Sequence, residues 1–203
     1  SGAIFDLNNF SQSIGTLSGG GASGGNITLG SATLTVTQGS DNTYSGAISG
    51  TGGLTKQGAF TLTLGASNAY SGTTTLTSGT LALGTTTSMG TGALSMGGGT
   101  LQASTALGTI TNNYSLTAPS TMGGTNSFTM SGTGTLGSNT LSATNTAGTI
   151  TLSGNISGTG GITRNGSGGT LILSGINSYS GGTSLASGVL ALGNTGAIGT
   201  GTL

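Results

Sequence analysis

The sequence predicts an all-β fold, a right-handed parallel β-helix in which residues 1–203 form one continuous solenoid. Three observations predict it: a long internal repeat, short segments of alternating apolar and small polar residues, and turns dense in Gly and Asn. Alternation with a period of two puts successive side chains on opposite faces of a strand. Gly and Asn tolerate the positive φ that sharp turns need. A β-sandwich or a propeller is the alternative arrangement of so many short strands.

The internal repeat decides between these folds. Residues 46–58 read GAISGTGGLTKQG and residues 154–166 read GNISGTGGITRNG, so Lys56 and Arg164 occupy equivalent positions. After a one-residue insertion the match continues from residues 62–84 to residues 171–193, and MGTGAL (89–94) matches IGTGTL (198–203). Two related repeats are therefore expected at about 46–94 and 154–203. Sequence units that recur in this way are typical of solenoids.

Each expected strand is short and lies between glycines, as in GTLALG (79–84), GTLILSG (169–175) and GVLALG (188–193). At about 20 to 25 residues per coil, the chain would form about eight to ten coils. Residues 105–147 match the repeat weakly and are assigned to the solenoid by continuity alone. The alternation predicts that a set of aliphatic side chains points into the core: Leu81, Leu83, Leu190, Leu192, Ile156, Ile162, Leu171 and Leu173.

The composition limits the classes of function. Gly, Ser and Thr make up 115 of the 203 residues, the only charged side chains are Asp6, Asp41, Lys56 and Arg164, and His and Cys are absent. A net charge of zero argues against a nucleic acid or an anionic membrane surface as partner. No apolar run is long enough to span a bilayer as a helix, so we expect no direct membrane insertion. Hydrophobic residues still make up 32% of the chain, which favours a folded protein over a disordered linker.

The stretches SGTGGLTKQGAFTLTLGASNAYSGTTTLTSGTLALG (49–84) and SGTGGITRNGSGGTLILSGINSYSGGTSLASGVLALG (157–193) resemble the autotransporter-associated β-strand repeat. Residues 5–21 and 26–36 also look like the segment that often precedes this repeat. The resemblance implies a passenger domain on the surface of a Gram-negative cell or released from it, exported through the outer membrane by a C-terminal β-barrel. It implies no catalytic, cofactor-binding or metal-binding residue, and none is assigned.

An enzyme must still be considered, because parallel β-helices host polysaccharide lyases and hydrolases. Glycoside hydrolysis usually requires two carboxylates about 5–10 Å apart. Asp6 and Asp41 are the only candidates, and their spacing could place them on one face of the rod, one or two coils apart. Both lie in turn-like contexts, FDLNN and GSDNTY, in which Asp commonly accepts bonds from nearby backbone N–H groups. We therefore expect no enzyme and no cofactor.

Two further pairs are equivalent between the copies. Lys56 and Arg164 could form a basic ladder for an anionic glycan, but the favoured interpretation is a solvated turn residue that hinders wrong strand pairing. Tyr70 and Tyr179 could stack on sugars in an exposed row. The favoured interpretation is that each ring packs over the turn before the next strand.

The expected function is structural: a rod segment of a bacterial surface or secreted passenger that is extracellular and could form fibres. The expected partners are other copies of the chain, stacked end to end or laterally, or further repeats of a longer chain. An adhesin-type module that binds glycans or cells is the alternative, with cell-surface glycans as its partners. A polysaccharide-active enzyme ranks third. Unpaired strand edges at both ends favour a piece of a longer rod over a stacking subunit.

Overall fold

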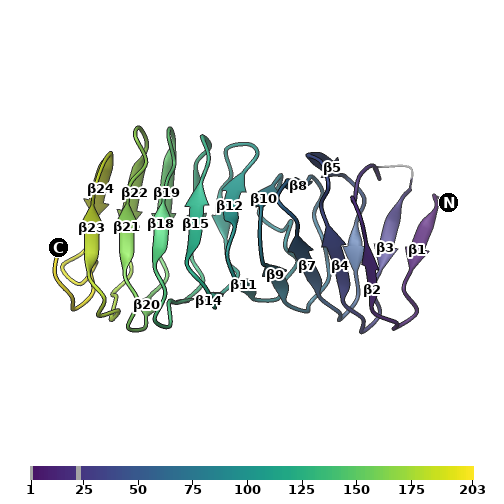
Figure 1. Cartoon of the computed structure of the whole chain (residues 1–203), viewed down its shortest axis with the longest axis horizontal. Helices are drawn as coiled ribbons and strands as arrows, with labels where there is room; N and C mark the ends of the chain where they lie inside the picture. The colour runs from purple at the N-terminus through teal and green to yellow at the C-terminus, as the bar shows by residue number, and fades with distance from the viewer. Residues whose placement is uncertain (1, 22–23) are drawn as a thin grey trace.

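The computed structural model describes residues 2–21 and 24–203, and within them it contains 24 strands and no helix. The strands stack in parallel into a solenoid of about nine coils, with the N-terminus at one end of the long axis and the C-terminus at the other (Figure 1). The predicted parallel β-solenoid is confirmed. The weakly matched residues 105–147 form the coils that contain β13 to β18, and these continue the same stack.

Four sheets run along the rod, and every strand pair between neighbouring coils is parallel. Sheet 1 consists of β1 (Ile4–Asp6), β3 (Asn26–Thr28) and β6 (Ile48–Ser49). Sheet 2 consists of β2 (Gln12–Ile14), β4 (Leu34–Thr37), β7 (Leu54–Gln57), β9 (Thr74–Leu76), β11 (Leu94–Met96), β14 (Tyr114–Leu116), β17 (Gly134–Thr135) and β20 (Ile156–Ser157). Sheet 3 consists of β5 (Asn42–Tyr44), β8 (Thr61–Leu64), β10 (Thr80–Leu83), β12 (Thr100–Ala103), β15 (Ser120–Gly123), β18 (Leu141–Ala143), β21 (Ile162–Arg164) and β23 (Thr183–Leu185). Sheet 4 consists of β13 (Thr109–Ile110), β16 (Phe128–Met130), β19 (Thr149–Leu152), β22 (Thr170–Leu173) and β24 (Val189–Leu192).

A coil with three strands visits three sheets in a fixed order, whereas the coils of β9–β10 and β11–β12 have strands in sheets 2 and 3 only. In the N-terminal part the chain runs from β3 in sheet 1 through β4 in sheet 2 to β5 in sheet 3, and then returns to sheet 1 at β6. In the C-terminal part it runs from β13 in sheet 4 through β14 and β15 to β16 in sheet 4. Sheets 1 and 4 thus hold the same place in the coil, at opposite ends of the rod.

The sequence step between paired residues measures the length of a coil. Leu34 pairs with Leu54, and Leu54 pairs with Thr74, so these two steps are equal. Other steps vary: the step from Thr170 to Val189 is shorter, and the step from Phe128 to Ile150 is longer. The coils lie at the short end of the predicted range, because short strands are joined by turns of only a few residues.

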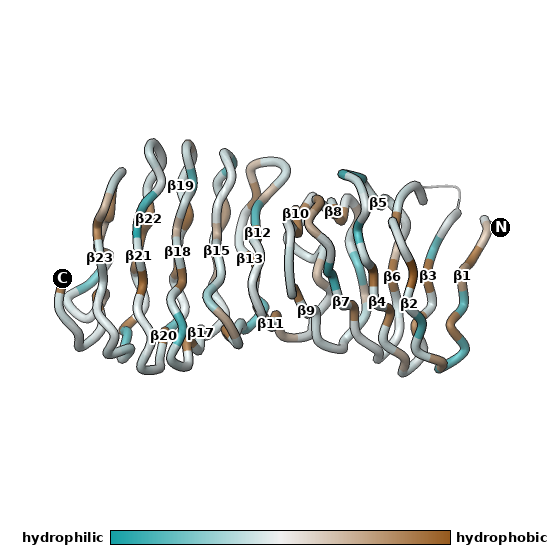
Figure 2. The backbone as a smooth tube through the Cα atoms, in the orientation of Figure 1, coloured by the Kyte–Doolittle hydropathy of each residue, from teal (hydrophilic) through white to brown (hydrophobic). Residues whose placement is uncertain are grey.

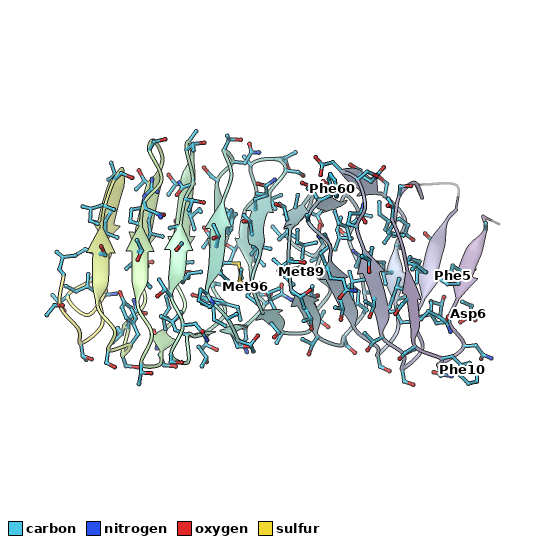
Figure 3. The ribbon with its side chains drawn as sticks, in the orientation of Figure 1. Phe5, Asp6, Phe10, Phe60, Met89 and Met96 are labelled. Carbon is cyan, nitrogen blue, oxygen red and sulfur yellow. The ribbon has the colours of Figure 1, made fainter. Side chains whose placement is uncertain are left out.

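The core is a column of small and medium aliphatic side chains inside the coils, and brown apolar segments recur along successive strands (Figure 2). Met89 and Met96 are buried in it, whereas Phe10 is exposed at the N-terminal end (Figure 3). Six of the eight aliphatic residues predicted to point inward are at most 1% exposed: Leu81, Leu83, Ile156, Ile162, Leu171 and Leu173.

The other two belong to β24, the outermost strand of sheet 4. Leu190 is partly buried, and the prediction that Leu192 is buried is wrong, because its side chain is 51% exposed. The register is the expected one, since Leu192 pairs with the buried Leu173. Its exposure follows from position: β24 has a neighbouring strand on one side only.

Candidate functional site

The two carboxylates do not come together. Asp6 lies in β1 of sheet 1, whereas Asp41 directly precedes β5 of sheet 3. Asp6 Oδ1 accepts a hydrogen bond from the backbone N–H of Asn8 at 2.9 Å, which confirms the predicted turn role. Asp41 instead accepts from the N–H of Thr61, in the next coil, at 2.7 Å. The expectation that the two could share a face is wrong, because Asp6 belongs to sheet 1 and Asp41 lies at the start of a strand of sheet 3. The carboxylate pair that glycoside hydrolysis needs is therefore not formed.

Lys56 and Arg164 are the clearest departure from the sequence interpretation. Both side chains are 0% exposed, so neither is a solvated turn residue. Lys56 follows Leu54 at a spacing of two, and Arg164 follows Ile162 in the same way, so each points inward with the strand's apolar residues. The alternation of the strand therefore indicated that both cations point inward. The nearby glycines, which are typical of turns, favoured the incorrect interpretation as solvated turn residues.

Each buried cation is surrounded by backbone carbonyls. Lys56 Nζ donates to the carbonyl oxygens of Gln57 (3.1 Å), Gly58 (2.9 Å) and, in the next coil, Ser78 (3.0 Å). These three bonds use all the donors of an ammonium group. Burial lowers the pKa of Lys56, and the nearby charge of Asp41 opposes that shift.

Arg164 has a larger set of carbonyl partners. Its guanidinium donates through Nη1 to Ala143 (3.0 Å), through Nη2 to Asn145 (3.1 Å) and to Gly169, and through Nε to Val189 (3.2 Å). The pKa of Arg164 is lowered by burial. An unpaired buried charge is very costly, so these carbonyls are what allows a cation in the core.

Tyr70 and Tyr179 are fully buried, which confirms the prediction that each packs within the turn. Tyr70 Oη lies 2.6 Å from Thr74 Oγ1, and Tyr179 makes the equivalent bond to Thr183. The phenol is desolvated, and this raises the pKa of both tyrosines. Gly90 has a φ of 61°, and a Cβ there would stand 2.1 Å from the carbonyl oxygen of Tyr70, so only glycine fits above the ring.

Asn68 and Asn177 form a third equivalent pair, one that the sequence reasoning did not single out. Asn68 Oδ1 accepts from the N–H of Ile48 at 2.7 Å, and its Nδ2 donates to the carbonyl of Ser88 at 2.6 Å. Asn177 links Ile156 and Ala197 in the same way, at 2.8 and 2.6 Å. Each amide thus continues the inter-coil hydrogen bonding where the backbone leaves the sheet. The Asn-x-Tyr sequence that recurs in both copies is the pattern from which this role could have been predicted.

The two copies lie on different sheets. Five steps along sheet 2 lead from Leu54 to Ile156, but the sequence equivalent of Leu54 is Ile162, which lies further along the chain in sheet 3. The same displacement moves β6 of sheet 1 to β20 of sheet 2, and β8 of sheet 3 to β22 of sheet 4. Lys56 and Arg164 therefore cannot form a ladder, because they belong to different sheets.

The outward face offers hydroxyl groups rather than charge. Within sheet 2 the paired outward residues form a column of hydroxyl side chains: Ser13, Thr35, Thr55, Thr75, Ser95, Ser115, Thr135 and Ser157. All four tyrosines are at most 3% exposed, so the exposed tyrosine row considered above is not formed. Among the described residues there is no group of three or more His, Cys, Asp or Glu side chains placed to hold a metal ion. The part of the chain that the structure covers also has no helix long and apolar enough to cross a membrane.

Comparison with known proteins identifies the repeat. Residues 54–83 and 162–192 match the family model of the Passenger-associated-transport-repeat. A stretch of 59 residues is 54% identical to the Adhesin BmaC autotransporter of Brucella suis biovar 1 (strain 1330); it covers 28% of this chain and 2% of that protein. No solved structure matches the chain. The two matched segments contain β7 to β10 and β21 to β24, and the chain therefore carries two passenger-associated transport repeats of the kind found in autotransporters.

Proposed function

We propose that this chain is a structural segment of an extracellular autotransporter passenger, a stiff rod at the cell surface or released from it, with no catalytic role of its own. One observation carries the proposal: the chemically distinctive residues of both repeats face inward and bond to the protein itself, the cations and asparagines to backbone groups and the tyrosines to threonine hydroxyls. The cations, the tyrosines and the bridging asparagines are all buried in this way. Residues kept for their side-chain chemistry at a ligand site would instead be accessible.

The match to an adhesin supports the proposed location, because that relative is named as an autotransporter. The chain spans about 2% of that relative's length, so what the whole relative binds is not carried over. The proposed contribution of the segment to such a protein is length and rigidity. Parallel coils supply both, since backbone N–H groups along the strands and turns donate to carbonyls of the neighbouring coil.

The second candidate function is an adhesive face, and the hydroxyl column of sheet 2 is the observation that favours it. Uncharged hydroxyl rows could hydrogen-bond a cell-surface glycan. To separate the two functions, Thr55→Asp and Ser95→Asp are introduced together into the full-length protein. The two positions lie two coils apart on the outward face, where a charge remains solvated.

The measurement is cell adhesion divided by the amount of protein on the surface, which an antibody reports. A structural segment predicts an unchanged ratio. A ratio that falls while the surface amount stays constant would establish the adhesive face instead. A glycan array probed with the unmodified segment gives an independent result, with no binding expected for a structural rod.

A further inference from the structure

The apolar pattern of these strands leaves their register poorly defined. Slippage by one residue would turn every apolar side chain outward, but slippage by two residues preserves the alternation. The outward residues of β9 and of the positions just before and after it are Thr73, Thr75 and Thr77. A two-residue slip therefore places one threonine where another stood. A strand of this composition does not choose between the two registers by its outward face.

The inward face even favours the slipped register. In the observed register Leu54 of β7 pairs with Thr74 of β9, and Lys56 pairs with Leu76. A two-residue slip would place Leu54 against Leu76, which is a better apolar contact. The second copy has the same property, because Ile162 pairs with Thr183 and Arg164 with Leu185.

The buried cations oppose that slip. Both have apolar neighbours in their columns: Lys56 lies between Val36 and Leu76, and Arg164 lies between Ala143 and Leu185. Lys56 needs the Ser78 carbonyl of the next coil, and Arg164 needs the Val189 carbonyl of the next coil. Two residues along a strand span about 6.6 Å, so a slip would carry each carbonyl out of hydrogen-bonding range.

We propose that Lys56 and Arg164 act as register clamps, one in each repeat, that select the native pairing between a coil and the next. A mispaired coil would bury an ammonium or guanidinium group without its full set of acceptors, which costs free energy. Only the native register avoids that cost. A single polar residue in an apolar seam is known to fix register in other repetitive folds, often without adding stability. The inference stands on the two carbonyl cages and is independent of the proposed function.

The test replaces each cation by methionine, a residue type that already occupies the same inward-facing column. Methionine already occupies the inward column of Lys56 at Met96 and the column of Arg164 at Met122. Lys56→Met and Arg164→Met are therefore expected to remain folded, with a melting temperature equal to that of the unmodified chain or higher. The variants should instead lose the single native register between neighbouring coils.

Register is read with engineered disulfides, because the chain has no cysteine. Thr55→Cys with Thr75→Cys reports the native pairing. Thr55→Cys with Thr77→Cys reports the slipped pairing, since these Cα atoms lie about 8 Å apart in the native register, too far for a disulfide. The full chain is refolded under oxidising conditions, and the two cross-link yields are compared by mass spectrometry.

The second copy supplies the matched control. Thr163→Cys reports its native pairing with Ser184→Cys and its slipped pairing with Ala186→Cys. Lys56→Met should raise the slipped yield severalfold in the first copy only, and Arg164→Met in the second copy only. A folded Lys56→Met chain with native cross-links alone would overturn the proposal. So would slippage in both copies after either change, or an unfolded chain, which would make the cation a source of stability rather than of register.

Discussion

Lys56 and Arg164 hold the same place in two sequence copies, yet different carbonyls surround them. Lys56 binds its own turn and the coil that follows, whereas Arg164 binds carbonyls in three consecutive coils. At the scale of single residues, a buried polar group is tolerated when its hydrogen-bonding capacity is satisfied, and both cations meet that condition. The same holds for Tyr70 and Tyr179, each bonded to a threonine in the strand that follows it.

Thr74 and Thr75 offer a matched pair for this principle. Thr74 is fully buried and bonded to Tyr70, while its neighbour Thr75 faces outward. Thr74→Ala leaves a buried phenol without its partner and should lower the free energy of unfolding by about 1–3 kcal/mol. Thr75→Ala should change it by about 0.5 kcal/mol or less. Urea denaturation of the two variants measures the difference, and equal losses would show that the Tyr70 bond contributes nothing specific.

Alkaline pH should destabilise the rod. Burial raises the pKa of Tyr44 to about 12 and also raises the pKa values of Tyr70, Tyr114 and Tyr179, whereas unfolded tyrosines ionise near pH 10. Stability from the neutral phenols is therefore complete below pH 10 and is lost as the pH rises toward 12.

Lys56 has the opposite effect on stability. Its pKa is lowered by burial, so the folded chain loses this proton at a lower pH than the unfolded chain, and rising pH therefore favours the folded state at this residue. Four tyrosines outnumber one lysine, so the melting temperature should fall between pH 10 and 12. A melting temperature that stays constant over this range would contradict the burial of the phenols.

At the scale of strands, the short alternating segments were sufficient to predict the parallel solenoid and most of the inward residues. The alternation of β22 placed Leu171 and Leu173 correctly, because register and face are local properties of a strand. The sheet on which each repeat lies could not be predicted. It depends on the sum of coil lengths, and small differences in the turns change that sum without altering the strand pattern.

The candidate site was predictable to a smaller extent. The turn role of Asp6 and the buried turn role of Tyr70 followed from local sequence. The alternation of β7 pointed Lys56 inward, but the strand alone could not establish its burial, because a cation in an apolar column needs surrounding carbonyls and one of these belongs to Ser78 in the next coil. Contacts between coils are the information that the linear pattern lacks.

Leu171 and Leu192 test the effect of coil stacking on burial. Leu171 is 0% exposed and pairs with Ile150 on one side and Leu190 on the other, whereas Leu192 is 51% exposed and pairs only with Leu173. Leu171→Ala should cost about 2–5 kcal/mol because it leaves a cavity. Leu192→Ala should cost less than about 1 kcal/mol. Chemical denaturation at a constant m-value checks the ranking, and the reverse order would show that the assigned coil stacking is wrong.

At the scale of the whole molecule, the repeat and the coil have different lengths. Five coils and one further sheet separate the two copies, so side chains that are equivalent in sequence point in different directions around the rod. The outermost strands also leave apolar side chains in solvent, among them Phe5 on β1 and Leu192 on β24 (43% and 51% exposed), whose pairing partners Ile27 and Leu173 are buried. Unpaired edges of this kind template further strand pairing.

We therefore expect residues 1–203, expressed alone, to self-associate through their outer strands. Size-exclusion chromatography with light scattering should show oligomers that grow with concentration. Val189→Lys with Leu192→Lys should reduce them, because charge on an edge strand discourages pairing. An unmodified chain that stays monomeric at every concentration would contradict this expectation.

The distinctive residues of the repeats face the core, and chemical labelling of Lys56 measures this orientation. Lys56 is the only lysine of the chain, so an amine-reactive reagent can modify only this side chain and the N-terminal amine. Thr77→Lys adds an exposed control one coil away. Peptide mass spectrometry should show rapid labelling of the introduced amine under native conditions, slow labelling of Lys56, and equal rates in denaturant. Native Lys56 that is labelled as fast as the control would contradict the inward orientation.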